Sequence, residues 1–456
     1  MASPDVIQTA AEAGAWLEGL INYERLPDLS EARLDLAPIE ALMERLGHPE
    51  RQLSVFHVAG SKGKGSLCLL TESILSALGE KVGTFTSPHL ERWTERFRIG
   101  GREIGEADLA SATEVVRPHV EALRSIADGP SPTFFDATTA VAFVLFSRAK
   151  VDRAVIEVGL GGRLDSTNVL KPAVTAVTQI ELEHTDKLGS RVEEIAFEKA
   201  GILKSGVPCV TGALVEPAQR VVEERAREIG VEVARLGRDF FLELSSAPEA
   251  EPGPFGFRES AFELDELSMP ILGRHQLDNA ALAIAAVRRL TNYPAERLAE
   301  AVRSGLASVR LPGRVEVVSE RPRVILDAAH TEASVRSLVE VLAAQRVDRR
   351  CLVLSISRDK AVASIVKLLA PVTDEIWLTR ADATRSTDLE TLDALVAPLM
   401  PGIPRHCVEN AEQAASEAFS TLGPRDLLCC AGSVYLAGAC RRILAGPGSP
   451  EASSSM

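Results

Sequence analysis

The sequence lacks the features that mark several classes of protein. Its seven cysteines are an odd number and form no C-x-x-C pair, which excludes a disulfide framework and indicates a reducing compartment. It contains no uninterrupted apolar run long enough to span a membrane. Its first residues lack a basic segment followed by an apolar core, so we expect no secretory signal and a cytoplasmic protein.

An excess of positive charge is also missing. The chain has 50 Lys and Arg residues against 64 Asp and Glu residues, a net charge of −14, which argues against nucleic acid or an anionic membrane surface as its main partner. An anionic substrate must therefore be held by local positive groups. Apolar material is ample, because 46% of the 456 residues are hydrophobic, and this length suggests two or three domains.

One short stretch combines glycine and lysine as a phosphate-binding turn requires. The segment 58–66, VAGSKGKGS, follows the apolar run 53–58 and precedes a helical pattern over 67–78. Glycines let the backbone approach an anion closely, and the N–H groups at a helix start point toward it. The residues predicted to bind a nucleotide here are Gly60, Ser61, Lys62, Gly63, Lys64, Gly65 and Ser66.

Lys64 is predicted to reach the outer phosphates of that nucleotide. The spacing G-x-x-G-K-G-S meets the common G-x-x-x-x-G-K-[ST] pattern only in part, so a glycine-rich turn that binds nothing is the alternative.

Apolar strands and amphipathic helices alternate along the rest of the chain. Buried strands predicted over 154–158 and 173–179, with helical crossovers, indicate a doubly wound, mostly parallel α/β sheet. A second alternation over 324–444 indicates a smaller, Rossmann-like α/β domain. We predict that two segments, 87–101 and 244–258, form irregular loops.

A proline and glycine break over 306–315 marks the predicted domain boundary. We therefore predict a nucleotide-binding domain over 1–308 and a second domain over 309–445. The low-complexity tail over 446–456 is expected to be disordered.

Polar side chains stand where the predicted strands end, and ligands of doubly wound sheets collect at that edge. Glu157 ends a buried strand, and an oxygen ligand there suits a magnesium ion beside phosphates; a carboxylate that caps the next turn is the alternative. His184 follows the strand 173–179, where a histidine with structural hydrogen bonds is the alternative. Asp327 and His330 end the first strand of the second domain and predict a cofactor site there.

Two basic residues, Lys199 and Arg314, have no clear role when each is considered by itself. Lys199 lies in a predicted helix and by itself resembles an ordinary surface lysine. Arg314 follows the proline and glycine break, where an arginine either clamps phosphate or carboxylate oxygens or remains solvated.

Ten short motifs occur in a fixed order: VAGSKGKGS, TSPHL, ERFRIGG, VIEVGLGGRLDSTN, EHTDKLG, EKAGI, GRHQLDNAALA, LPGR, LDAAH and GSVYLAG. Together they resemble the folylpolyglutamate synthase/dihydrofolate synthase family of the Mur ligase superfamily, from the first strand to the last helix. The resemblance implies an ATP-dependent amide ligase. ATP phosphorylates a carboxylate, the amino group of glutamate attacks the acyl phosphate, and phosphate leaves.

The resemblance also implies roles for single residues. Ser87 and Glu157 match a first magnesium site, and His184 matches a second. Lys199 matches a lysine that is carbamylated and then faces the second metal, so the implied cofactors are ATP and two Mg²⁺ ions, with Lys64, His184 and Lys199 as catalytic residues. The further implied contacts are those with ATP, at Asn279, Arg314 and Asp327, and those with the pterin-bearing substrate, at Thr133, Leu164, Asp165 and Ser166.

We therefore expect a cytoplasmic, monomeric ligase that adds L-glutamate to dihydropteroate and to folates. One alternative keeps the chemistry without dihydropteroate, because RLDLAPIEAL over 33–42 replaces a glycine-containing segment of bifunctional members. Another is a Mur-type ligase with a different acceptor. A third is a nucleotide-binding regulatory protein without turnover; the joint presence of Ser87, Glu157, His184 and Lys199 argues against it, since a binder needs no second metal.

Overall fold

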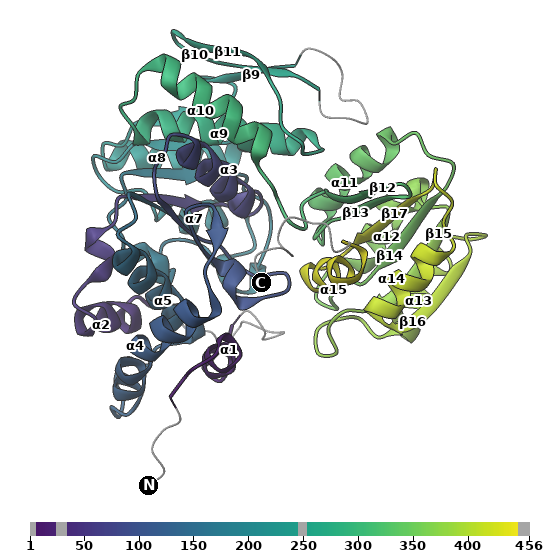
Figure 1. The fold of residues 1–456 in the computed structure, drawn as a ribbon, viewed down its shortest axis with the longest axis horizontal. Helices are drawn as coiled ribbons and strands as arrows, with labels where there is room; N and C mark the ends of the chain where they lie inside the picture. The colour runs from purple at the N-terminus through teal and green to yellow at the C-terminus, as the bar shows by residue number, and fades with distance from the viewer. Residues whose placement is uncertain (1–5, 24–33, 245–252, 446–456) are drawn as a thin grey trace. The chain divides into compact units, whose positions relative to one another are not determined.

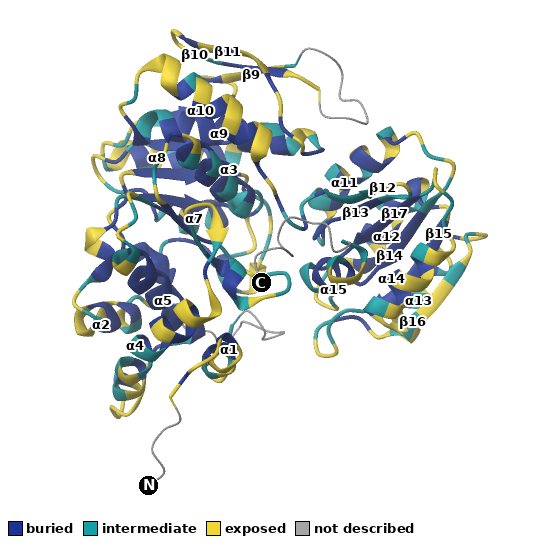
Figure 2. Cartoon of the chain, viewed as in Figure 1, coloured by how far each residue is buried: buried dark blue, intermediate teal, exposed yellow. Residues whose placement is uncertain are grey.

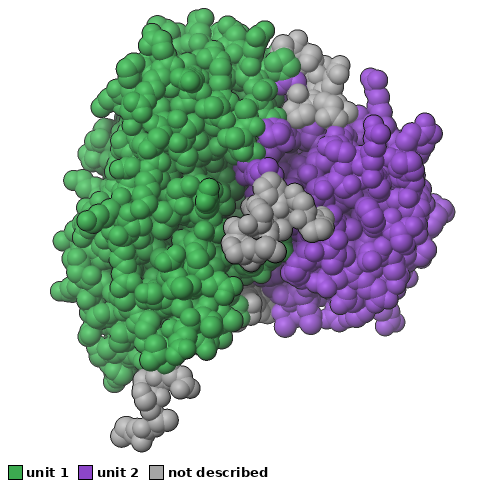
Figure 3. Space-filling view, viewed as in Figure 1, with its two compact units in different colours: residues 1–245, 254–269, 276–309 green, residues 246–253, 270–275, 310–456 purple. Residues whose placement is uncertain are grey.

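The computed structural model describes residues 6–23, 34–244 and 253–445. The chain forms two compact units, which Figure 3 distinguishes by colour. Unit 1 comprises Met1–Ser245, Pro254–Met269 and Gln276–Val309, and unit 2 comprises Ser246–Gly253, Pro270–His275 and Arg310–Met456. The tail predicted to be disordered, 446–456, lies outside the described residues.

Unit 1 is built on an eight-stranded sheet in the order β4-β3-β2-β5-β1-β6-β7-β8. In Figure 1 the chain of unit 1 runs from purple through teal to green. Six of its strands are parallel: β1 (Val55–Ala59), β2 (Val82–Phe85), β5 (Arg153–Glu157), β6 (Val174–Val177), β7 (Cys209–Thr211) and β8 (Val233–Arg235). The antiparallel strands β3 (Phe97–Ile99) and β4 (Arg102–Glu103) extend one edge. The predicted mostly parallel α/β sheet is confirmed, with β1 between β5 and β6.

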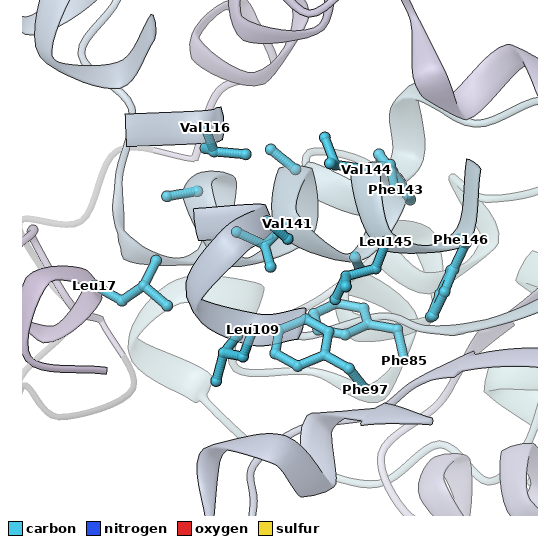
Figure 4. Close-up of a cluster of buried hydrophobic side chains, with 14 of the residues drawn as sticks. Leu17, Phe85, Phe97, Leu109, Val116, Val141, Phe143, Val144, Leu145 and Phe146 are labelled. Carbon is cyan, nitrogen blue, oxygen red and sulfur yellow. The ribbon is translucent and has the colours of Figure 1, made fainter. Parts of the chain in front are cut away.

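Helices enclose this sheet and supply its core. They are α1 (Ala10–Glu18), α2 (Ala37–Arg45), α3 (Lys64–Ala77), α4 (Glu106–Arg124), α5 (Phe134–Ala149), α6 (Thr185–Leu188), α7 (Val192–Ala200), α8 (Glu216–Glu228), α9 (Arg274–Leu290) and α10 (Ala295–Ser308). In Figure 4 the apolar side chains of α5 pack with Phe85 and Phe97, whose ring centroids lie 5.6 Å apart. Figure 2 shows the central strands of this sheet buried and the outer faces of the helices exposed.

Two segments predicted as irregular loops contain strands, so those predictions were wrong. Within 87–101, β3 pairs antiparallel with β2; three residues are too few to produce a recognisable alternation. On either side of 245–252, which lie outside the described residues, β9 (Phe241–Leu244), β10 (Phe255–Glu259) and β11 (Phe262–Leu267) form a separate antiparallel sheet. The prolines and glycines between β9 and β10 dominated the composition and concealed these strands.

Unit 2 contains a six-stranded sheet in the order β12-β13-β17-β14-β15-β16. Its strands are β12 (Glu316–Glu320), β13 (Arg323–Leu326), β14 (Arg350–Leu354), β15 (Glu375–Arg380), β16 (Arg405–Asn410) and β17 (Leu427–Ala431), and all but β12 are parallel. The second α/β sheet is thus confirmed. The two edge strands were not predicted, because β12 and β16 are only partly buried and lack an apolar run.

The helices of unit 2 alternate with these strands. They are α11 (Glu332–Ala344), α12 (Val362–Leu369), α13 (Leu389–Val396), α14 (Ala411–Ser420) and α15 (Val434–Leu444). Across the described ranges of both units, no helix combines the length and the apolar character needed to cross a membrane.

Candidate active site

The predicted phosphate loop joins the end of β1 to the start of α3. Gly63 precedes α3 with a φ of 85°, and a Cβ atom there would lie 2.5 Å from the Asn279 Oδ1 atom. Gly60 is equally restricted, because an added Cβ would lie 1.8 Å from the Thr178 Oγ1 atom. Within the described structure no side chain caps the first turn of α3, so its N–H groups are suited to an anion.

The residues that follow β6 hold this loop in place. The Ser61 N–H donates to the Gln179 carbonyl at 2.6 Å, and the Ser61 hydroxyl accepts from the Glu181 N–H at 3.0 Å. The Lys64 Nζ atom donates to the Gly60 carbonyl at 3.0 Å, so the lysine folds back over the loop. Ser66 is buried in the first turn of α3. The loop is therefore a compact, preorganised cradle.

Asn279 lies on α9, within reach of this cradle. It is buried, and its Nδ2 group donates to the Gln276 Oε1 atom at 3.1 Å. Its other amide atom faces Gly63, as the clash with an added Cβ shows. Asn279, predicted to contact ATP, is therefore next to the predicted phosphate loop in unit 1.

Glu157 is the last residue of β5 and lies beside the ends of β1 and β2. It is only 4% exposed, and β5 pairs it in register with Val58 of β1. Its Oε2 atom accepts the Ser87 N–H at 3.0 Å and would lie 3.4 Å from a Cβ added at Gly65 in α3. A buried carboxylate beside a serine and the first turn of α3 supplies the hard oxygen ligand that magnesium prefers, so these residues fit the predicted first metal site.

Lys199 is almost completely buried, at 1% exposure, which corrects its first interpretation as a surface lysine. Its Nζ atom lies 2.8 Å from the Glu183 Oε1 atom, and Lys62 approaches the other oxygen of that carboxylate at 3.9 Å. Burial lowers the pKa of Lys199 to about 8, because it disfavours the charged ammonium form. The positive charges of Lys64 and Lys62 act in the same direction, and the Glu183 carboxylate opposes these effects only in part.

Glu183 remains ionised despite its burial. Desolvation by itself would raise the pKa of this carboxyl, but the ammonium groups of Lys199, Lys64 and Lys62 outweigh it and hold the pKa well below its usual range. Sequence reasoning missed Glu183. Its position next to His184, directly after a buried strand, was the available signal.

His184 precedes α6 and adopts a positive φ of 46°. It is exposed, and its carbonyl accepts the N–H groups of Lys187 and Leu188. Across the described parts of the chain, no three His, Cys, Asp or Glu side chains are grouped so that they could hold a metal by themselves. A metal ion at Glu157 or at His184 would therefore need ligands of other kinds, such as the Ser87 hydroxyl, water or oxygen atoms of bound substrates.

The predicted acceptor-substrate residues converge on the loop after β5. The Ser166 hydroxyl donates to the Asp136 Oδ1 atom at 2.6 Å, and the Thr133 hydroxyl donates to the Asp136 Oδ2 atom at 2.7 Å. The neighbouring Asp165 is buried, while Leu164 is partly exposed. Sequence reasoning also missed Asp136, although its position three residues after Thr133 forms a capping box at the start of α5.

The predicted residues of unit 2 also lie close together. The Asp327 carboxylate accepts the N–H groups of Val315 and Ala329, both at 2.7 Å, and the positive charge of Arg314 acts on it. Burial nevertheless raises the pKa of Asp327 above its ordinary value. His330 lies beside it, with its Nδ1 atom 2.7 Å from the Ala328 carbonyl.

Unit 2 also contains a pocket of about 440 Å³. It lies past the end of β14, between the starts of α12 and α13, in the range typical of small-molecule sites. Its polar lining includes two cations, one carboxylate and several hydroxyl groups: Arg358, Lys360, Asp388, Ser364, Thr387 and Thr391. The Lys360 Nζ atom also lies 2.7 Å from the Asp359 Oδ2 atom. Sequence reasoning did not identify it.

Two family models match the chain. The Mur ligase middle domain matches residues 58–287, and the Mur ligase glutamate ligase domain matches residues 313–434. The "Dihydrofolate synthase/folylpolyglutamate synthase" of Bacillus subtilis is 36% identical over 380 residues, covering 82% of this chain and 86% of the relative.

Solved structures agree over almost the whole chain. Escherichia coli FolC in complex with DHPP and ADP gives a TM-score of 0.84 at 31% identity, covering 98% of this chain and 100% of that one. The bifunctional folylpolyglutamate synthase/dihydrofolate synthase of Yersinia pestis complexed with AMPPNP and Mn ion gives a TM-score of 0.82 at 31% identity, covering 96% of this chain and 99% of that one. A bifunctional folylpolyglutamate synthase/dihydrofolate synthase with Mn, AMPPNP and L-glutamate bound gives a TM-score of 0.81 at 31% identity, covering 96% of this chain and 98% of that one.

Proposed function

The chain belongs to the Mur ligase family and, within it, to the folylpolyglutamate synthase/dihydrofolate synthases, and from this premise we propose that it joins L-glutamate to dihydropteroate and to reduced folates. Members of this family are ATP-dependent ligases. The observation that carries the proposal is the position of Glu157. Its buried carboxylate lies against the phosphate-loop helix and accepts the Ser87 N–H, within the unit that also buries Lys199.

The first step brings two anions together. A carboxylate oxygen of the acceptor attacks the γ-phosphorus of ATP, the bond to the β-phosphate oxygen breaks, and ADP leaves. Lys62 and Lys64 reduce the repulsion, because both ammonium groups lie at the phosphate loop. A magnesium ion held by Glu157 and the Ser87 hydroxyl would supply further neutralising charge at the phosphate oxygens.

The second step forms the amide bond. The amino nitrogen of glutamate attacks the acyl carbon, a proton leaves the nitrogen, and the tetrahedral intermediate expels inorganic phosphate. Exclusion of water matters here, since water would hydrolyse the acyl phosphate. The acceptor is expected to lie along the loop that contains Asp165 and Ser166.

A carbamate on Lys199 is part of this proposal. The amine nitrogen attacks the carbon of carbon dioxide and a proton leaves, which converts a cation into a carboxylate. The new anion then stands next to Glu183, now 2.8 Å from the Nζ atom, and two adjacent anions require a cation between them or beside them. This requirement supports a second magnesium ion, with His184, the residue after Glu183, as its proposed ligand.

The pocket of unit 2 is the proposed site for glutamate, whose two carboxylates suit Arg358 and Lys360. Replacing Lys360 with methionine is expected to raise the KM for glutamate about tenfold, which is the effect of losing one charge-assisted hydrogen bond. The KM for ATP should not change. The control is Lys367→Met, because Lys367 is exposed on α12, the helix that begins two residues after Lys360, and does not line the pocket. An unchanged KM for glutamate in the first variant would contradict this site.

The function is tested with the purified protein, ATP, magnesium, glutamate and one acceptor at a time. Phosphate release that depends on glutamate with both dihydropteroate and tetrahydrofolate is the expected result. Release with tetrahydrofolate alone would leave a folylpolyglutamate synthase. Release with neither acceptor would overturn the proposal, and turnover of a non-pterin carboxylate would point to another Mur-type ligase.

A further inference from the structure

A histidine lies in the middle of the central strand of unit 1. His57 of β1 is completely buried, and the other residues of this strand are Val55, Phe56, Val58 and Ala59. Its Nε2 atom lies 2.8 Å from the Thr167 hydroxyl oxygen, in the loop that follows β5. Burial of a polar ring costs free energy unless its polar atoms form hydrogen bonds, and the Thr167 hydroxyl is the partner of Nε2.

The Thr167 hydroxyl links this ring to Asp165. The same oxygen forms a short hydrogen bond to the Asp165 Oδ1 atom. A hydroxyl carries one proton, and an ionised carboxylate can only accept. The Thr167 proton therefore points to Asp165, and the His57 Nε2–H donates to Thr167.

The protonation state of the His57 ring agrees with donation from Nε2–H to Thr167. Burial lowers the pKa of His57 to about 3, with a smaller contribution from Lys204, so the ring is neutral. With its proton on Nε2, the ring has an unprotonated Nδ1 atom. That atom is buried and has no hydrogen-bond partner in the described part of the chain.

The ionised form of the Asp165 carboxyl depends on the hydrogen-bond donors around it. Burial raises the pKa of this carboxyl to about 6, and three hydrogen bonds oppose the rise. They come from the Leu160 N–H at 2.9 Å, the Thr167 N–H at 3.0 Å and the Thr167 hydroxyl. A carboxylate has about four acceptor positions, so about one remains for a donor on a ligand.

We propose that His57 is a positioning residue for the acceptor substrate: through Thr167 it directs a proton onto Asp165 and keeps that carboxylate an oriented hydrogen-bond acceptor. The ligand group that it serves is an N–H donor of the pteridine ring. This inference rests on the proposed function, which assigns the acceptor to the loop containing Asp165 and Ser166.

The test compares KM values for tetrahydrofolate, ATP and glutamate in matched variants. Thr167→Val keeps the shape and removes the hydroxyl, and it is expected to raise the KM for tetrahydrofolate about tenfold while the other two KM values and kcat change less than about twofold. Thr167→Ser should restore the wild-type value. The control is Thr113→Val, because the Thr113 hydroxyl on α4 is also buried and has no hydrogen-bond partner among the described residues.

A double-mutant cycle tests the part played by His57. His57→Phe should raise the KM for tetrahydrofolate, and His57→Phe with Thr167→Val should raise it no more than Thr167→Val alone, since the ring acts through the hydroxyl. His57→Gln retains an N–H donor and should remain close to the wild type. Effects that multiply in the double variant, or that raise all three KM values equally, would overturn the proposal.

An NMR measurement makes the test independent of turnover. In protein labelled with ¹⁵N-histidine, the signal lost in His57→Phe should be that of a neutral ring protonated on Nε2. A ring protonated on Nδ1 or on both nitrogens would overturn the inference. Wild-type protein that turns over neither acceptor overturns the proposed function, whereas active wild type with an unaffected Thr167→Val variant overturns this inference alone.

Discussion

Replacing Glu157 with glutamine is expected to reduce kcat by about 10²- to 10³-fold, the usual effect of removing one group that stabilises charge in the transition state. Glutamine has nearly the same shape, and its carbonyl oxygen can still accept the Ser87 N–H, now 3.0 Å from the carboxylate. It lacks the negative charge that would hold a divalent cation beside the phosphates. The measurement is glutamate-dependent phosphate release over a magnesium titration.

The control for this substitution is Glu80, which contacts the opposite end of β5 from Glu157. Glu80 pairs with Arg153, the first residue of β5, at 2.9 Å, and its carboxylate is also largely buried. Glu80→Gln should lower the melting temperature and leave kcat within about twofold, because it breaks an ion pair far along the strand from Glu157. A Glu157→Gln variant that retains turnover within a few-fold of the wild type would contradict the metal assignment.

Replacing Lys199 with either alanine or arginine is expected to reduce kcat by about 10²-fold or more. Alanine removes the amine, whereas arginine keeps a positive charge but cannot form the carbamate. Both outcomes follow if the working group is an anion that faces a metal. A buried amine whose pKa is about 8 has a substantial neutral fraction at neutral to mildly alkaline pH, and that fraction reacts with carbon dioxide.

Carbon dioxide provides the second measurement. Activity of the wild type should fall in buffer depleted of carbon dioxide and return when bicarbonate is added, and carbon NMR with labelled bicarbonate should show a carbamate that is missing from Lys199→Arg. The recovered activity should increase as the pH rises toward and through 8, because deprotonation exposes the amine. Full activity of Lys199→Arg would show that a positive charge is sufficient and would refute the carbamate.

Features that depend on neighbours along the chain were predictable. The glycine-rich turn between β1 and α3 was predicted from closely spaced glycines with a flanking strand and helix, and Gly60 and Gly63 adopt the backbone geometry that glycine favours. The parallel sheet follows from short buried strands separated by helices. Glu157 was predicted at a strand end, and the carboxyl ends of neighbouring parallel strands share one edge.

Features that depend on partners distant in sequence were not predictable. Helical spacing gave no reason to bury Lys199, because its partner Glu183 comes from a separate loop. The antiparallel sheet of β9, β10 and β11 was hidden behind a proline- and glycine-rich stretch, since pairing between strands is not visible in composition.

By itself the sequence determined the α/β class, because the alternation of strands and helices is a local property of the chain, and its ordered motifs carried the resemblance to the ligase family. Only the tertiary structure decided which polar groups meet. His57 and Thr167 are separated by 110 positions yet share a 2.8 Å contact, and Lys199 is buried against Glu183. Burial and pairing arise from chain packing, and they determine whether an ordinary histidine or lysine can take part in chemistry.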